Sequence, residues 1–194
     1  MFYCDSGAYF IKSVIPLIEL CQEKEQDIIP FEIRLQEKFW TKRDAFILMD
    51  CDRPEYTDSF QRIGIYSLWR KTDFSTRVVD EWLTYAQDAR IITDMPNQCG
   101  QPYYPGYRDH RHDQSIFSLL SKQYQLEAYR DPANPNPAQS VYYPNSPYEP
   151  LIRSTRKRNS WAEFLHLPKL IVALPVLWRM WWEMRTRPGS TLNC

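Results

Sequence analysis

Five consecutive residues near the middle of the chain carry its densest set of chemically active side chains. The run 110–114, His-Arg-His-Asp-Gln, supplies two imidazoles, a guanidinium, a carboxylate and a carboxamide. Apolar residues at helical spacing begin directly after it, at Ile116, so the run lies at the start of a predicted helix. Helix N-terminal amides and Arg111 favour an anion. His110 and His112 can ligate a metal or donate to phosphate oxygens.

The same run also fits a purely structural role. Asp113 can be a helix N-cap whose side chain accepts hydrogen bonds from the amides of Ser115 or Ile116. An N-cap explains the carboxylate, but it does not require two histidines, an arginine and a glutamine around it. We therefore favour a ligand site, in which Asp113 and Gln114 hold hydroxyl groups of a sugar.

A second candidate is Asp5, which follows a short predicted strand over residues 1–4. In open α/β sheets ligands bind at the carboxyl ends of strands. A carboxylate there can hold a divalent cation that bridges a diphosphate, because hard cations prefer oxygen ligands. Taken alone, Asp5-Ser6-Gly7 is more typical of a plain turn. Asp50-Cys51-Asp52 matches a D-x-D pattern, but it follows a predicted helix and precedes Arg53-Pro54, so we interpret it as a solvated loop.

Composition narrows the class of protein. A chain of 194 residues with 43% hydrophobic and 15% aromatic residues fits one folded domain with a core. The 24 basic residues balance the 24 acidic ones, so nucleic acid is not an expected partner. The five cysteines are scattered, which argues against a zinc knuckle or a disulfide framework and favours a reducing compartment.

Helical and strand-like patterns alternate along residues 1–131 and predict an α/β sheet. The expected elements are a strand over 1–4, a helix to about Glu23, a strand over 28–35 pushed to an edge by Pro30, a helix opened by Thr41 and Asp44 as a capping box, a strand over 63–69, a long helix from Ser75, a strand or helix end over 91–94, a loop over 96–107, a helix after His112 and a last strand over 126–129.

The carboxyl-terminal part has a different composition. Residues 132–159 form a Pro/Asn-rich and basic connector, and residues 160–194 form an amphipathic, Trp-rich tail. The apolar run 170–178 is too short to span a bilayer, which takes roughly 20 residues. Clustered tryptophans with basic flanks indicate peripheral membrane contact through 161–187, and a helix covering the domain's own core is the alternative. The expected location is cytoplasmic or membrane-associated.

Several short motifs occur together in a fixed order. They are Tyr3-Cys4-Asp5-Ser6-Gly7, Thr41-Lys42-Arg43-Asp44, Gln61-Arg62-Ile63-Gly64, Arg70-Lys71 before Glu81-Trp82-Leu83, Asp94-Met95-Pro96-Asn97 and His110-Arg111-His112-Asp113-Gln114-Ser115. In this order the chain resembles a group of uncharacterised glycosyltransferase-like proteins related to the GT-A nucleotide-sugar transferases. The resemblance covers roughly residues 2–131, and the His110 run is its most specific part.

The resemblance implies a GT-A-like mixed sheet with flanking helices, and transfer of a sugar from a nucleoside diphosphate donor to a hydroxyl acceptor, in glycan synthesis. Asp5 would bind a divalent metal, Mn or Mg, although Gly7 stands where a D-x-D motif has its second acidic residue. Asp113 would be catalytic. The implied substrate-binding residues are Gln61, Arg62, Gly64, His110, Arg111, His112 and Gln114.

One departure from that family limits the expected activity. Only four residues precede Asp5, whereas nucleotide-binding strands and helices precede the metal-binding strand in the family. We therefore expect the carboxyl-terminal part of such an enzyme, with weak or absent transferase activity. The alternatives are a metal-dependent hydrolase using His110, His112, Asp113 and His166, and a non-catalytic, membrane-associated interaction protein. The transferase hypothesis requires Asp5 and the His110 run to open onto one crevice.

Overall fold

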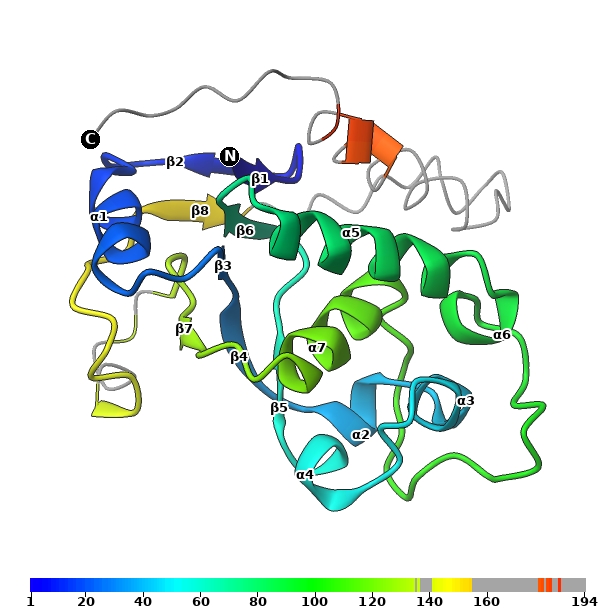
Figure 1. Ribbon diagram of the computed structural model, residues 1–194. Coiled ribbons are helices and arrows are strands. Elements are labelled where there is room, and N and C mark those ends of the chain that lie inside the picture. The colour runs from blue at the N-terminus through cyan, green and yellow to red at the C-terminus, as the bar shows by residue number, and fades with distance from the viewer. Residues whose placement is uncertain (135, 137–140, 155–177, 180, 183–184, 186–194) are drawn as a thin grey trace.

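The fold is mixed α/β, with helices packed around small sheets (Figure 1). The structure is a computed structural model that describes residues 1–134, 136, 141–154, 178–179, 181–182 and 185. Its elements are β1 (Phe2–Cys4), β2 (Ala8–Phe10), α1 (Ile15–Glu23), β3 (Ile28–Ile29), β4 (Phe31–Gln36), α2 (Glu37–Trp40), α3 (Arg43–Leu48), α4 (Pro54–Thr57), β5 (Phe60–Arg62), β6 (Tyr66–Trp69), α5 (Asp73–Ala86), α6 (Ala89–Ile92), α7 (Asp113–Gln123), β7 (Tyr129–Arg130) and β8 (Ile152–Ser154).

Strand β6 lies at the centre of the molecule and is buried along its whole length. It pairs antiparallel with β1 on one side and with β3 on the other. Because side chains alternate across a strand, Tyr66 and Leu68 point to one hydrophobic cluster while Trp69 points to another. Strand β6 therefore joins two parts of the core.

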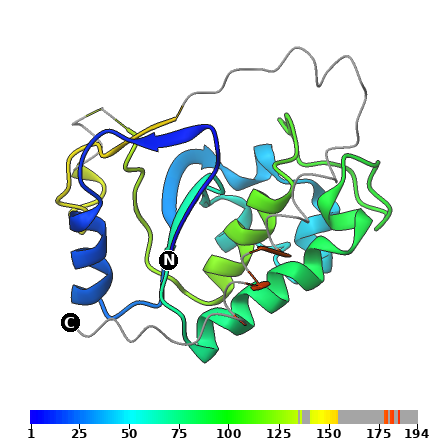
Figure 2. The ribbon, with the colours of Figure 1, turned by 90° about the horizontal axis from the view of Figure 1, so that it is seen from above.

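The first part, here called the α5–α7 cluster, packs those two helices against α3 and α6 (Figures 1 and 2). Aromatic rings form its centre: Trp82 stacks on Trp69, with ring centroids 6.2 Å apart, and on Phe117 at 5.0 Å. The long helix predicted from Ser75 is confirmed as α5. Its buried face includes Val78 and Trp82, and Thr72 forms a capping box with Ser75.

The second part, here called the α1 cluster, lies at the other end of the molecule (Figures 1 and 2). Leu17 and Leu20 from α1 pack there with Ile29, Leu68 and Ile152. Strand β8, which brings Ile152, pairs antiparallel with β2. Neither β2 nor β8 was expected from the sequence pattern.

Several sequence predictions need correction. Pro30 does not place one long strand at an edge; it divides the run into β3 and β4, which belong to different sheets, and β4 is the central strand of β5-β4-β7. The predicted strand 63–69 is shorter than expected: it begins at Tyr66 as β6, and Ile63, Gly64 and Ile65 form the link from β5, which ends at Arg62. Of the two alternatives for 91–94, the helix end is confirmed, because α6 ends at Ile92; the last predicted strand is displaced to β7.

The capping box predicted for Thr41 and Asp44 is also wrong. The N-cap residue of α3 is Lys42, and the Thr41 hydroxyl donates instead to the Glu37 carboxylate at 2.7 Å. Asp44 accepts hydrogen bonds from the backbone amides of Gln98 and Cys99, at 2.6 and 3.0 Å. These two side chains therefore serve tertiary contacts rather than the start of their own helix.

Hydrogen bonds hold the long loop between α6 and α7 to the rest of the protein, both before and after the middle of the loop. On one side, the buried Lys42 ammonium donates to the Met95 carbonyl at 2.7 Å, and Asp44 holds the amides just described. On the other side, the Arg108 amide donates to the Phe39 carbonyl at 2.9 Å, and the Arg111 amide donates to the Trp40 carbonyl at 3.0 Å. The loop therefore holds the run 110–114 in place.

The membrane contact predicted for 161–187 lies mostly outside the described residues. Of that segment, Trp181 packs against the α5–α7 cluster and Arg185 forms an ion pair with Asp80 at 2.9 Å. Over the residues for which positions are described, the helices are too short or too polar to cross a membrane.

Candidate functional site

The two sequence regions singled out above meet at one pocket of about 290 Å³. Strand β1 brings Asp5 to it, the link between β5 and β6 brings Gly64, and the start of α7 brings Asp113. The pocket is lined by Asp5, Gly64, Ile65, Asp109, His110, Arg111, His112, Asp113 and Gln114. The predicted shared crevice is thus confirmed, although Asp5 and Asp113 are far apart in the sequence.

The pairing of β1 with β6 explains how Asp5 arrives there. The Asp5 amide donates to the Ile65 carbonyl at 2.8 Å, directly after the β1–β6 ladder ends. Gly64, the preceding residue, lies against α7, where a Cβ on it would be 2.9 Å from the Gln114 Cβ. Glycine at this position therefore lets the β5–β6 link approach the helix closely.

Three carboxylates, those of Asp5, Asp109 and Asp113, line the pocket, and the charge of Asp5 acts on Asp113. Burial raises the pKa of Asp113, and the charge of Asp5 raises this pKa further, while the Gln114 amide opposes the shift. The Tyr3 hydroxyl donates to Asp5, and burial, together with this hydrogen bond, raises the pKa of Tyr3. A carboxyl group with a raised pKa is a stronger base than an ordinary carboxylate, which suits it to accept a proton.

His112 holds an unusual backbone conformation at the edge of the pocket. It is the N-cap residue of α7, with φ +49° and ψ −118°, a region that costs a non-glycine residue about 1–3 kcal/mol. Its Nε2 lies 2.9 Å from a carboxylate oxygen of Asp94. Asp113 is the first helical residue, so its interpretation as the N-cap is wrong.

The His110 ring is turned into the protein. Its Nδ1 accepts a hydrogen bond from the Lys42 amide at 3.2 Å, and its Nε2 donates to the Ile91 carbonyl at 2.7 Å. Both nitrogens are therefore engaged in a neutral ring, and burial lowers the pKa of His110 to about 3. This geometry assigns His110 to holding the turn in place, rather than to the metal or phosphate contact that the sequence indicated.

Arg111 combines a place in the pocket wall with an aromatic contact. Its guanidinium lies over the Trp40 ring, 4.3 Å from the ring centroid, and Arg108 lies over the same ring at 5.7 Å. Such stacking restricts the guanidinium and keeps its charge beside the pocket.

The remaining predicted substrate-binding residues divide into two groups. Gly64 and Gln114 line the pocket. Gln61 and Arg62 are buried in the described structure and are not among the lining residues. Arg62 pairs with Glu32, and burial lowers the pKa of Arg62 to about 10. Gln61 and Arg62 are therefore not positioned to contact a donor sugar bound in the pocket.

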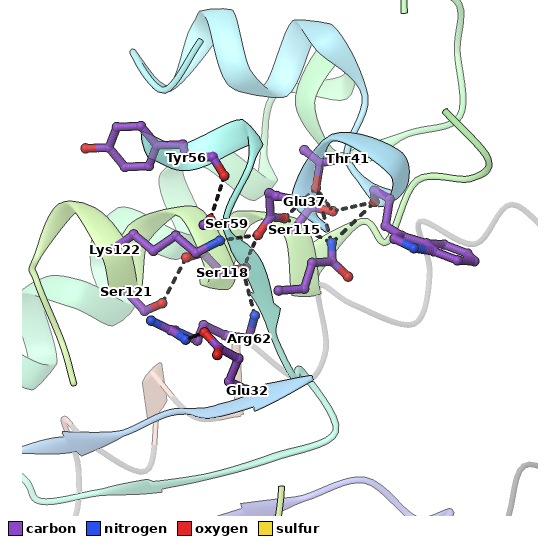
Figure 3. Close-up of polar contacts among 12 residues, drawn as sticks. Glu32, Glu37, Thr41, Tyr56, Ser59, Arg62, Ser115, Ser118, Ser121 and Lys122 are labelled. Atoms are coloured by element: carbon purple, nitrogen blue, oxygen red, sulfur yellow. Dashed lines mark hydrogen bonds and ion pairs between the residues drawn. The ribbon is translucent and has the colours of Figure 1, made fainter. Parts of the chain in front are cut away.

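A buried polar network extends behind the pocket and was missed by sequence reasoning (Figure 3). At its centre is the Glu37 carboxylate, which is fully buried and forms an ion pair with Lys122. Burial lowers the pKa of Lys122, and the charge of Glu37 opposes this shift. A sequence signal did exist, because Ser115, Ser118 and Ser121 recur every three residues among the apolar residues Ile116, Phe117, Leu119 and Leu120 of the helix.

Metal binding at Asp5 was a further expectation. Among the described residues, no three His, Cys, Asp or Glu side chains gather as a metal site. Magnesium commonly takes one or two protein carboxylates, together with water and substrate phosphates. Asp5 and Asp113 lie close enough for one charge to shift the pKa of the other, so the pair is compatible with that kind of binding.

The D-x-D pattern at 50–52 lies in the loop after α3, as expected. Asp50 is exposed, with φ +54°. Asp52 is paired rather than solvated: Arg43 donates to it from Nε and Nη2 at 3.0 and 2.8 Å, and the Tyr104 hydroxyl donates at 2.7 Å. These contacts tie α3 to the loop that precedes α7.

The chain has no significant match to a protein-family model, a curated protein or a solved structure.

Proposed function

We propose that the pocket binds the sugar of a nucleotide-sugar donor or of its acceptor, and that the protein takes part in glycosyl transfer to a hydroxyl group. The main support is the convergence of Asp5, Gly64 and the run 110–114 on one pocket. Carboxylate and amide oxygens accept hydrogen bonds from sugar hydroxyls. The proposal includes a GT-A-like arrangement for residues 1–131.

Each pocket residue has a role in this proposal. Asp113 orients the acceptor hydroxyl and takes its proton, a role for which a raised pKa is suited. Arg111 lies at the leaving diphosphate, where its positive charge stabilises the negative charge that develops, and His112 beside it can donate a hydrogen bond to a phosphate oxygen. Asp5 would hold a magnesium or manganese ion, which would supply further charge stabilisation of the diphosphate.

The strained backbone of His112 also supports a functional pocket. A glycine would adopt its φ of +49° without steric cost. Keeping an imidazole there costs conformational energy, and strain of this kind is typical of residues retained for binding or catalysis.

Ligand titration monitored by amide NMR tests the proposal. The intact chain is titrated with UDP-glucose, UDP-galactose and UDP-N-acetylglucosamine in the presence of magnesium or manganese. We expect shifts at Gly64 and at residues 109–114, weakened at least about tenfold in Asp113→Asn, because one charged hydrogen bond contributes about 1.5–3 kcal/mol. Asp50→Asn, an exposed carboxylate outside the pocket lining, is the matched control.

The outcome of that titration is decisive for sugar binding. If a folded protein shows no pocket shifts with any of these donors, or if Asp50→Asn weakens binding as much as Asp113→Asn, the proposal fails. Release of the nucleoside diphosphate, measured in the same samples, then shows whether bound donor is turned over.

Contact of residues 161–187 with a membrane surface is a separate proposal, supported by the clustered tryptophans and their basic flanks. Co-sedimentation with vesicles containing phosphatidylserine tests it. Binding by the intact chain that is lost from a chain ending at Ser160 supports the proposal, and binding by neither removes it.

A further inference from the structure

The buried Glu37 carboxylate is surrounded by hydrogen-bond donors from three directions (Figure 3). Lys122 and the Ser118 hydroxyl donate to one oxygen, Oε2, the latter at 2.6 Å. The Thr41 hydroxyl and the Gln61 side-chain amide donate to the other, Oε1, at 2.7 and 3.0 Å. An ionised carboxylate only accepts hydrogen bonds, so each of these neighbours must turn a donor toward Glu37.

This requirement passes along two glutamine side chains to the pocket. The Gln61 NH₂ group faces Glu37, with a longer contact to the Trp40 carbonyl at 3.4 Å, so the Gln61 oxygen faces the other way. That oxygen accepts from the Gln114 NH₂ group at 2.9 Å. The Gln114 oxygen then accepts from the Gly64 backbone amide at 3.2 Å. The buried charge of Glu37 thus fixes, in both glutamine side chains, that the oxygen rather than the NH₂ group points toward the pocket.

Gln114 and Gly64 line the pocket, and the oxygen end of the Gln114 amide is the end beside Gly64. A carbonyl oxygen has two lone pairs, and the Gly64 amide takes one of them. We propose that Glu37 is a positioning residue that sets the polarity of this amide chain, so that Gln114 presents an acceptor to a ligand O–H group. The ligand class, sugar hydroxyls, rests on the proposed function. The orientation of the amides does not depend on it.

An isosteric substitution makes the proposal testable. In Glu37→Gln the single remaining oxygen faces Lys122, which can only donate, and the new NH₂ group faces Gln61. Gln61 must then turn its oxygen toward residue 37, and Gln114 must turn its oxygen toward Gln61. The Gln114 NH₂ group then meets the Gly64 N–H, and two donors face each other.

A second substitution should restore the original polarity. In Glu37→Gln/Gln61→Glu the carboxylate moves one step along the chain and accepts from both residue 37 and Gln114. The Gln114 oxygen returns to the Gly64 amide. A role in packing alone would not produce such rescue, because the second change removes another native hydrogen-bond donor from the interior.

Hydrogen exchange at the Gly64 amide, measured by NMR on the intact chain, is the readout. We expect exchange roughly tenfold faster in Glu37→Gln than in wild type, as for loss of one hydrogen bond, and a rate near the wild-type rate in the double variant. Glu55→Gln, an exposed glutamate paired with Arg53, should leave the rate unchanged. Unchanged exchange in a folded Glu37→Gln, or a double variant no better than the single one, would overturn the proposal.

Two further results keep the test decisive. If Glu37→Gln does not fold, a folded double variant supports the proposal and an unfolded one refutes it. UDP-glucose serves as the ligand probe: when wild type binds it, the shift of the Gln114 side-chain amide should be lost in Glu37→Gln and return in the double variant. Failure of wild type to bind contradicts the proposed function, while the exchange rates still decide the amide polarity.

Discussion

Burial displaces the pKa values of His110 and Asp113 in opposite directions at the same turn. It lowers that of His110 to about 3 and raises that of Asp113. In both cases the neutral form is favoured, because a low-dielectric interior penalises charge. The turn therefore couples protein stability to pH through two groups with separate signs.

For His110, acid is expected to destabilise the fold. Between its ordinary pKa of 6.5 and about 3, the unfolded chain binds a proton that the folded ring does not. The free energy of unfolding should therefore fall as the pH falls, by about 2 kcal/mol between pH 7 and pH 5 from this group. Urea unfolding at both pH values checks this. His110→Gln should show a correspondingly smaller drop, and an equal drop in both proteins would contradict it.

For Asp113, the sign is opposite. Its folded pKa lies above the ordinary value of 3.8, so its contribution to stability is present in acid and is lost as the pH rises through the raised pKa. Asp113→Asn should therefore be more stable than wild type at pH 7.5, with the difference shrinking toward pH 4.

In addition, Asp5→Asn should lower the pKa of Asp113, which carboxyl NMR titration measures. An unchanged Asp113 pKa would mean that the two side chains do not interact.

At the residue scale, the sequence predicted which side-chain types lie together at the pocket. It did not predict which of them already hydrogen-bond to other parts of the protein. Asp5 and Asp113 were placed correctly at one pocket. His110 and Gln61 were predicted to contact a ligand, yet their polar atoms bond to Lys42, Ile91, Glu37 and Gln114. These partners come from other elements, and pairing of this kind depends on packing that local spacing does not encode.

At the element scale, the contact between the β5–β6 link and α7 leaves no room for a methyl group. A Cβ on Gly64 would lie 2.9 Å from the Gln114 Cβ and 3.2 Å from its Cα. Gly64→Ala should therefore move the start of α7 and cost about 1–3 kcal/mol of unfolding free energy. Urea unfolding measures the cost, and amide NMR should show shifts at residues 110–114. A variant with wild-type stability would show that the link can move away freely.

Periodicity predicted helices better than strands here. Helix α5 and helix α7 have long apolar stripes and were predicted with nearly correct starts. The strands have only two to six residues, which is too few for alternation to be decisive. Pro30 divides a run that was predicted as one strand, and Gly64 lies in the link before β6 rather than inside the strand predicted over 63–69.

At the scale of the whole molecule, the two clusters share strand β6 and should unfold as one unit. Leu68 is 5% exposed and belongs to the α1 cluster, while its neighbour Trp69 belongs to the α5–α7 cluster. Leu68→Ala should cost about 2–5 kcal/mol and lower protection in both clusters equally. Hydrogen exchange measured separately over α1 and α5 checks this. Loss of protection confined to α1 would show that the clusters unfold independently.

The fold class was predictable from the alternation of patterns, and the structure confirms a mixed α/β protein. The division into small sheets was not predictable. It depends on strands distant in the sequence, such as β8 pairing with β2 and β7 pairing parallel with β4. Such pairings are decided by the side chains that cover each sheet face, and a single sequence does not display these contacts.

The fastened loop before α7 has a practical consequence. Tyr103, in the middle of that loop, is 37% exposed, so chymotrypsin should cut after it. Lys42 and Asp44 would still hold the part of the loop before the cut, through hydrogen bonds to Met95 and Gln98. The amides of Arg108 and Arg111 would still bond to α2 and hold the part after the cut. The nicked halves should elute together on gel filtration in native buffer and separate only in denaturant. After such a cleavage the two fragments would be held together by noncovalent contacts alone.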